Sequence, residues 1–193
     1  MARQVIPNSG FWSTLAASIN GNFTELYQAV RSGIYDYNDA ATQSTPINVT
    51  AAAGWVDLTN DGAGPFTNKS YAFADIADIY DTVNNEFDFS SLALGDTLDI
   101  RLDVEATTTA PNQEVKVALF MAQGSGAEYS LPWISAYPKS AGPYQALRFN
   151  GLYIGDNNSK NFPAKFKIMS DANATVKVNG WYVRVNRRAQ EVV

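Results

Sequence analysis

The chain has 193 residues, and it contains neither cysteine nor histidine. Without thiol and imidazole side chains it has no disulfides, no thiolate or imidazole metal sites, no cysteine nucleophile and no serine–histidine–aspartate triad. The formal net charge is -5 and charged residues make up 17%, so we expect no phosphate-neutralising surface and no nucleic-acid partner.

The length fits one main domain with a complete hydrophobic core. The first residues carry one arginine and no apolar stretch typical of a signal peptide. No segment reaches the run of about 18 apolar residues that a membrane-spanning helix needs. We therefore expect synthesis in the cytoplasm and no membrane insertion.

An N-terminal helix is the first expected element, and residues 1–33 form a helical anchor or oligomerisation segment. Apolar residues recur there at steps of three or four, as on one face of a helix, and Gly33 stands where the helix would end. A narrow apolar face must be buried, either on the chain's own domain or against copies of itself. The residues of this face are Trp12, Leu15, Ile19, Phe23, Leu26 and Val30.

Residues 34–46 are expected to be a linker, and residues 47–193 a β-sandwich domain. The clearest strand covers residues 97–106, where apolar and charged residues alternate. The alternation also marks residues 115–121 and 176–185, with a change of phase at Asn179 and Gly180 that predicts a β-bulge. Weaker strand patterns cover residues 46–50, 54–59, 76–81, 128–135, 145–154 and 164–169.

These elements predict an all-β fold: a two-sheet antiparallel sandwich, jelly-roll-like, preceded by one N-terminal α-helix. The number and length of the strands favour a jelly roll over an immunoglobulin topology. Turn-forming residues separate the strands.

Two groups of carboxylates are the candidates for chemistry. Asp75, Asp78 and Asp81 recur every three residues and supply the hard oxygen ligands that calcium prefers, but no EF-hand spacing accompanies them. Solvated carboxylates are the favoured interpretation, so we expect neither a metal nor another cofactor.

The second group lies on one face of the strand 97–106. Asp99, Asp103 and Glu105 have the arrangement from which a glycosidase would draw an acid and a nucleophile. Arg101 lies between them on the same face, which favours ionised groups paired across strands over a carboxyl kept protonated. We expect no catalytic residues and no enzymatic activity.

Aromatic residues concentrate in the strands and loops of the expected sandwich. Most of them are expected in the core, but exposed tyrosine and tryptophan side chains stack on sugars or anchor protein interfaces. Trp133 and Tyr137 flank Ser135 and are bounded by prolines. They are the candidate ligand contacts.

The segment 19–27 reads I-N-G-N-F-T-E-L-Y. It resembles the N-x-N-F-T-E-L-Y helix near the N-termini of tail-fibre and other virion structural proteins of tailed bacteriophages. The stretches 87–101 and 178–182 are similar to parts of jelly-roll domains in phage appendage and decoration proteins.

This resemblance implies a homotrimer in the virion, docked on other virion proteins by its N-terminal segment, with the sandwich facing outward and a host-surface glycan as a candidate partner. Unlike a long fibre, the chain has no shaft between helix and sandwich. A decoration or cement protein that stabilises the head is the alternative within this class. A free carbohydrate-binding module or glycosidase is the alternative of another class. The missing signal peptide favours a virion protein, because lysis releases it without export.

Overall fold

The computed structural model describes residues 32–59, 68, 69, 71–76 and 78–187, together with three residues of the N-terminal segment. Leu15, Ser18 and Ile19 have helical backbone, and Leu15 is 44% exposed. The rest of the predicted helix lies outside the described residues, including the remaining members of its apolar face, Trp12, Phe23, Leu26 and Val30.

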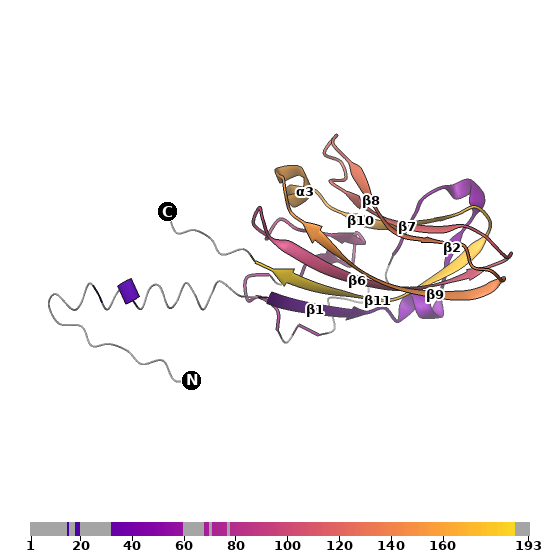
Figure 1. Ribbon diagram of the computed structural model, residues 1–193, viewed down its shortest axis with the longest axis horizontal. Helices are drawn as coiled ribbons and strands as arrows, with labels where there is room; N and C mark the ends of the chain where they lie inside the picture. Colours follow the sequence, from indigo (N-terminus) through magenta and orange to yellow (C-terminus); the bar gives the residue numbers. More distant parts are fainter. Residues whose placement is uncertain are drawn as a thin grey trace.

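The described chain is a two-sheet antiparallel β-sandwich, as the sequence predicts (Figure 1). Sheet A has the order β1-β11-β6-β9, with β2 also paired to β11. Sheet B has the order β3-β10-β7-β8. The strands of sheet A are β1 (Ser32–Asn38), β2 (Ile47–Val49), β6 (Thr97–Thr108), β9 (Gly142–Tyr153) and β11 (Ala174–Asn186). Those of sheet B are β3 (Val56–Asp57), β7 (Val115–Met121), β8 (Tyr129–Ala136) and β10 (Lys165–Ser170).

Shorter elements complete the sandwich. They are α2 (Ala41–Ser44), the 3-10 turn η1 (Ala51–Ala53), α3 (Asn157–Asn161) and the paired strands β4 (Tyr80–Asp81) and β5 (Glu86–Phe87). A β-bridge from Phe87 to Ala164 ties β5 to the start of β10. No helix in the described part of the chain is long and apolar enough to span a bilayer.

The prediction that residues 34–46 form a linker is wrong. Residues 32–38 form β1, which pairs with β11 along its whole length, and α2 follows it. Tyr35 and Tyr37 point into the core while Asp36 points outward. The sandwich therefore begins at Ser32 rather than at residue 47. The sequence did not show this strand, because two large core side chains make only a weak alternation. The strand predicted over residues 76–81 is likewise reduced to β4.

The predicted β-bulge is confirmed. The register between β11 and β6 shifts between Val178 and Gly180, so Asn179 is the extra residue. A Cβ atom at Gly180 would lie much closer to the Tyr37 carbonyl oxygen than the van der Waals contact distance allows. Glycine at this position therefore lets β1 pair closely with β11.

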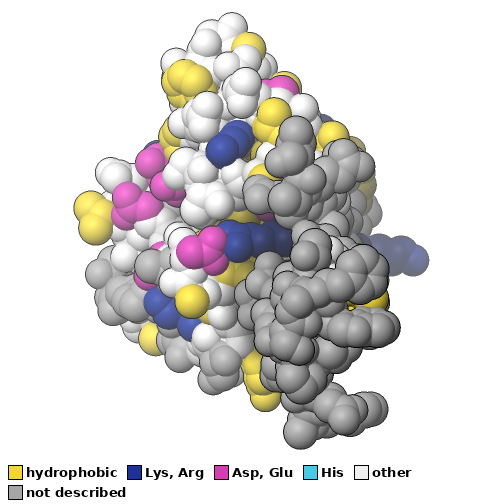
Figure 2. All heavy atoms as spheres, turned by 90° about the vertical axis from the view of Figure 1, so that its left-hand side faces the viewer, with side chains coloured by type: hydrophobic (Ala, Val, Ile, Leu, Met, Phe, Trp, Pro, Cys, Tyr) yellow, Lys and Arg dark blue, Asp and Glu magenta, His cyan; other side chains and the backbone are white. Residues whose placement is uncertain are grey.

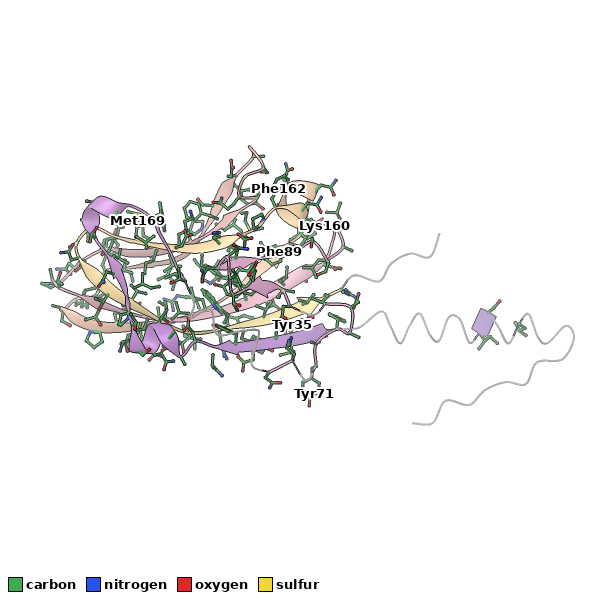
Figure 3. All side chains as sticks on the ribbon, turned by 180° about the vertical axis from the view of Figure 1, so that it is seen from behind. Tyr35, Tyr71, Phe89, Lys160, Phe162 and Met169 are labelled. Atoms are coloured by element: carbon green, nitrogen blue, oxygen red, sulfur yellow. The ribbon has the colours of Figure 1, made fainter. Side chains whose placement is uncertain are left out.

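Aromatic side chains from both sheets form the centre of the core. Trp181 of β11 stacks on Phe166 of β10, with ring centroids 5.3 Å apart and an interplanar angle of 13°. Phe87 meets both rings edge-on. Phe89, labelled in Figure 3 between the two sheets, is fully buried. Burying each such side chain contributes about 1.5–3 kcal/mol to the stability of the fold. Because the rings come from both sheets, the cluster holds the sheets together.

We predict that Gly180→Ala lowers the free energy of unfolding by about 2 kcal/mol, because the new methyl group displaces the β1 backbone. Gly151→Ala is the matched control on β9 of the same sheet, since its Cβ would lie 3.7 Å from Asp99 Oδ1, an ordinary contact. The control should change stability by less than about 1 kcal/mol. Urea unfolding of both variants measures the difference, and equal midpoints would contradict the tight β1–β11 contact.

Candidate functional site

The first candidate ligand contact, Trp133, is a core residue. Its side chain is only 6% exposed and packs edge-on against Phe166, with ring centroids 4.9 Å apart. In the register between β7 and β8, Val117 pairs with Ile134 and Ala118 with Pro132, which leaves Trp133 as a bulge residue. The bulge turns both Trp133 and Ile134 inward. The prediction that Trp133 lies at the surface is wrong.

Tyr137, the second candidate, is 58% exposed just after β8. Its hydroxyl donates a hydrogen bond to Glu114 Oε1, and Lys116 Nζ lies 2.8 Å from the same oxygen. Lys116 first, and the Tyr137 hydroxyl second, lower the pKa of Glu114. The same carboxylate raises the pKa of both Lys116 and Tyr137. Tyr137 is therefore accessible and fixed in place, and its contact with a ligand stays a prediction.

The carboxylates of β6 are paired across strands, as the sequence favours. Asp99 Oδ2 accepts hydrogen bonds from Arg184 Nη2 at 2.5 Å and Nε at 2.9 Å. Glu105 Oε1 lies 3.8 Å from Lys177 Nζ. Both cations come from β11, the strand beside β6. The Nη2 atom of Arg101 lies 3.8 Å from Asp36 Oδ1 of β1.

Asp103, between these two pairs, is held by amides. Its Oδ1 accepts hydrogen bonds from Gln145 Nε2 of β9 and Asn179 Nδ2 of β11, both at 3.1 Å. Asn179 is the bulge residue, so the bulge also supplies a donor to this carboxylate. Each of the three groups is thus engaged as a hydrogen-bond acceptor or an ion-pair partner within the sheet.

The candidate calcium ligands have separate partners. Asp75 forms a two-pronged ion pair with Arg187, at 2.7 Å and 3.0 Å. Asp78 accepts from Lys69 Nζ at 3.2 Å, and Asp81 accepts N–H groups of its own turn. Within the described ranges no group of three or more carboxylates is arranged to hold a metal ion. Figure 2 shows acidic and basic side chains lying next to each other on the face toward the start of β1.

The outward side of sheet A carries a row of interacting side chains that sequence reasoning missed. Asp36, Tyr182, Arg101 and Phe149 pair in register across β1, β11, β6 and β9. The Arg101 guanidinium lies 5.2 Å from the Tyr182 ring centroid, and its Nη2 is 3.8 Å from Asp36 Oδ1. The rings of Phe149 and Tyr182 are 6.3 Å apart. Arg101 is therefore held by an aromatic face and a carboxylate.

The edge strand β9 extends this row. Leu147, Phe149 and Tyr153 point outward and are 51%, 47% and 61% exposed, with only Gly151 interrupting the series. We call Leu147, Phe149, Tyr153, Tyr182 and Arg101 the aromatic face of sheet A. In the sequence this face is marked only by the apolar residues at positions 147, 149 and 153, which share one side of the strand. The pattern did not identify the outer side of β9, because apolar residues also stand at the inward positions 146 and 152.

The outward side of sheet B is different. Its aromatic residue Phe120 is covered by the chain itself: Trp55 meets its ring edge-on with centroids 5.1 Å apart, and Lys167 Nζ lies 5.1 Å from its centroid. Lys165 and Lys167 also pair with Asp57, at 3.7 Å and 3.2 Å. The exposed aromatic row is thus a property of sheet A among the described residues.

No family model matches the chain, and no curated protein matches it. Several solved structures resemble its fold, and two of them are described here. Eiger TNF from S. frugiperda is 8% identical, covers 86% of this chain and 98% of its own, and has a TM-score of 0.35. A chain in the structure of infectious bursal disease virus, Gx strain, is 7% identical, covers 84% of this chain and 31% of its own, and has a TM-score of 0.34. Likenesses this distant assign no function.

We predict that Tyr137→Phe raises the pKa of Glu114 toward the ordinary carboxyl value, because one donor to the ionised carboxylate is lost. In the native protein the lowered pKa adds stability above the unfolded carboxyl pKa, and this is lost as pH falls through the folded pKa. Carbon-13 NMR titration of Glu114 checks the shift, with Ser135→Ala on β8 as the control. An unchanged titration curve in the Tyr137 variant would show that the hydroxyl does not bind the carboxylate.

Proposed function

We propose that the chain is a non-catalytic structural protein of a phage virion, a homotrimer docked by its N-terminal segment, with a jelly-roll sandwich turned outward as part of a tail fibre or appendage. The observation that carries this proposal is the amphipathic N-terminal segment. Its residues 19–27 resemble the helix motif of phage virion proteins, and the first strand of the sandwich begins shortly afterwards at Ser32.

The described residues of the segment support an intermolecular role. Leu15 and Ile19 belong to the predicted apolar face and have helical backbone. Leu15 is exposed and Ile19 only half-buried. Apolar side chains such as Leu15 that the sandwich leaves exposed are stabilised by burial against another chain. Because β1 begins at Ser32, a docked segment holds the sandwich close to its docking site.

The strand order supports the jelly-roll assignment. After β6 in sheet A the chain forms β7 and β8 in sheet B, returns to sheet A as β9, crosses to sheet B as β10 and ends in sheet A as β11. Sheets ordered β1-β11-β6-β9 and β3-β10-β7-β8 have the pattern of eight strands in two Greek keys. Such a sandwich has its loops at its ends, where Tyr137 is accessible to a host-surface glycan.

The paired carboxylates support the non-catalytic assignment. A glycosidase needs one carboxyl kept protonated by its surroundings next to an ionised one. Asp99 and Glu105 instead lie beside Arg184 and Lys177, so both carboxylates are engaged in ion pairs within the sheet. The decoration-protein alternative shares the same docking chemistry and differs in its place on the particle.

We predict that removal of residues 1–31 leaves a folded sandwich that is monomeric and no longer joins the particle. Among the described residues, the core side chains that join the sheets lie after residue 31, so circular dichroism should show unchanged β structure. Sedimentation should give three times the mass of one chain for the full-length protein and one chain for the truncated form.

Point variants in the helix provide the matched control. Leu15→Asp should weaken the trimer and reduce incorporation into the particle, whereas Ser18→Asp, at an exposed helical position outside the apolar face, should not. If the truncated protein still joins the particle at normal copy number, docking does not depend on this segment.

A further inference from the structure

We infer that a short segment of the chain guards the edge of β1 and keeps this strand from pairing with another molecule. The segment consists of residues 68, 69 and 71–76, which we call the strap. It lies on the side of β1 that faces away from β11. The inference concerns the described sandwich and does not depend on the proposed virion role.

The strap takes the place that a neighbouring strand would have. Asp36 and Asn68 exchange two backbone hydrogen bonds, both of 2.9 Å, and so form an antiparallel β-bridge. Further along β1, the N–H of Ile34 donates to the carbonyl of Tyr71 at 3.2 Å. Backbone groups that an edge strand would otherwise offer to another chain are therefore bound within the same chain.

The sequence of β1 explains why its edge needs a cover. Proteins protect the edges of sheets with lysine, proline or inward-pointing charges, because an uncovered edge strand is a template for pairing. Strand β1 has none of these: its inward positions are Gly33, Tyr35 and Tyr37, and Asp36 is its one charged residue. The opposite edge strand, β9, contains a proline and an arginine instead.

Side chains of β1 fasten the strap from within the sandwich. The buried hydroxyl of Tyr35 donates to the carbonyl of Ile76 at 3.2 Å and accepts the N–H of Phe73 at 3.3 Å. The ring of Phe73 packs on Gly33, where a Cβ atom would come within 2.6 Å of it. Tyr71, labelled in Figure 3 at this edge, is 73% exposed, so the backbone of the strap and not this ring covers β1.

Arg187, just beyond the end of β11, pins the strap. Its guanidinium lies 4.4 Å from the centroid of the Phe73 ring. It also donates two hydrogen bonds to Asp75, at 2.7 Å and 3.0 Å. A guanidinium that stacks on a ring and pairs with a carboxylate holds both groups in one geometry. Removing this side chain should loosen the strap and leave the hydrogen bonds between β1 and β11 in place.

Amide hydrogen exchange along β1 in the Arg187→Ala protein tests the guard. Alternate N–H groups of a strand point to opposite sides, so those of Ile34 and Asp36 face the strap and those of Tyr35 and Tyr37 face β11. We expect exchange at Ile34 and Asp36 to become about tenfold faster, because local opening no longer requires the pin to be kept. Exchange at Tyr35 and Tyr37 should stay unchanged.

Arg184→Ala is the matched control variant. Arg184 also stands on β11 and binds an aspartate with two hydrogen bonds, but its partner is Asp99 of β6, on the other side of β11 from β1. This variant should leave all four exchange rates unchanged. Equal acceleration of all four amides in the Arg187 variant would show that β1 and the strap open as one unit, which would overturn a separate guard.

A proline in the strap provides a test that leaves β1 and β11 unaltered. Asn68→Pro removes the N–H that donates to Asp36, whereas Asn68→Ala keeps it. The proline variant should again accelerate exchange at Ile34 and Asp36 about tenfold, and the alanine variant should not. Unchanged exchange in both the Arg187 and the proline variants would overturn the inference.

Sedimentation of the full-length variants tests the consequence of opening the strap. An uncovered β1 edge offers its N–H and C=O groups to a second molecule. Arg187→Ala and Asn68→Pro should therefore produce species heavier than the unmodified protein as the concentration rises, and the two control variants should not. Faster exchange without heavier species would show that the strap does not prevent association. Because each variant is compared with the unmodified protein, the result is independent of that protein's own copy number.

Discussion

The β-bulge at Asn179 determines which side chains of β11 face the core and which face outward. Before the bulge Val176 and Val178 point inward, and after it Trp181, Val183 and Val185 do. Because side chains alternate along a strand, loss of the extra residue would reverse every position on one side of it. The stack of Trp181 on Phe166, which joins the two sheets at the core centre, depends on this shift.

The same bulge shapes the outer surface. It turns Tyr182 and Arg184 outward, where they meet Arg101 and Asp99 of β6. It also places Asn179 as a donor to Asp103. The Trp181 stack, the contacts of Asp99 and Asp103 with β11, and the Arg101–Tyr182 contact therefore all depend on one local feature of this strand.

Sequence reasoning predicted the elements with strong alternation. Strands β6, β7 and β11 follow regular apolar patterns, and the Asn-Gly pair at the phase change identified the bulge in β11. Strand β1 was missed because Tyr35 and Tyr37 are its only large core residues. The bulge at Trp133 has no glycine or asparagine to mark it, and Pro132 beside it is tolerated because β8 is an edge strand.

The candidate sites were harder to predict, because they depend on which strands become neighbours. Asp99 and Arg184 are separated by 85 positions in the sequence, and nothing in the local pattern of β6 identifies a partner on β11. The nearby Arg101 lies over Tyr182 of β11, a neighbour that the sequence does not identify either. In the same way, the outward row on β9 becomes visible only once β9 is placed at the edge of sheet A.

A cryo-EM map of the full-length assembly shows at once how many copies associate and through which segment. We expect three copies, gathered through their N-terminal segments, with the sandwiches turned outward. Single copies bound separately, or copies joined only through their sandwiches, would contradict the proposed assembly.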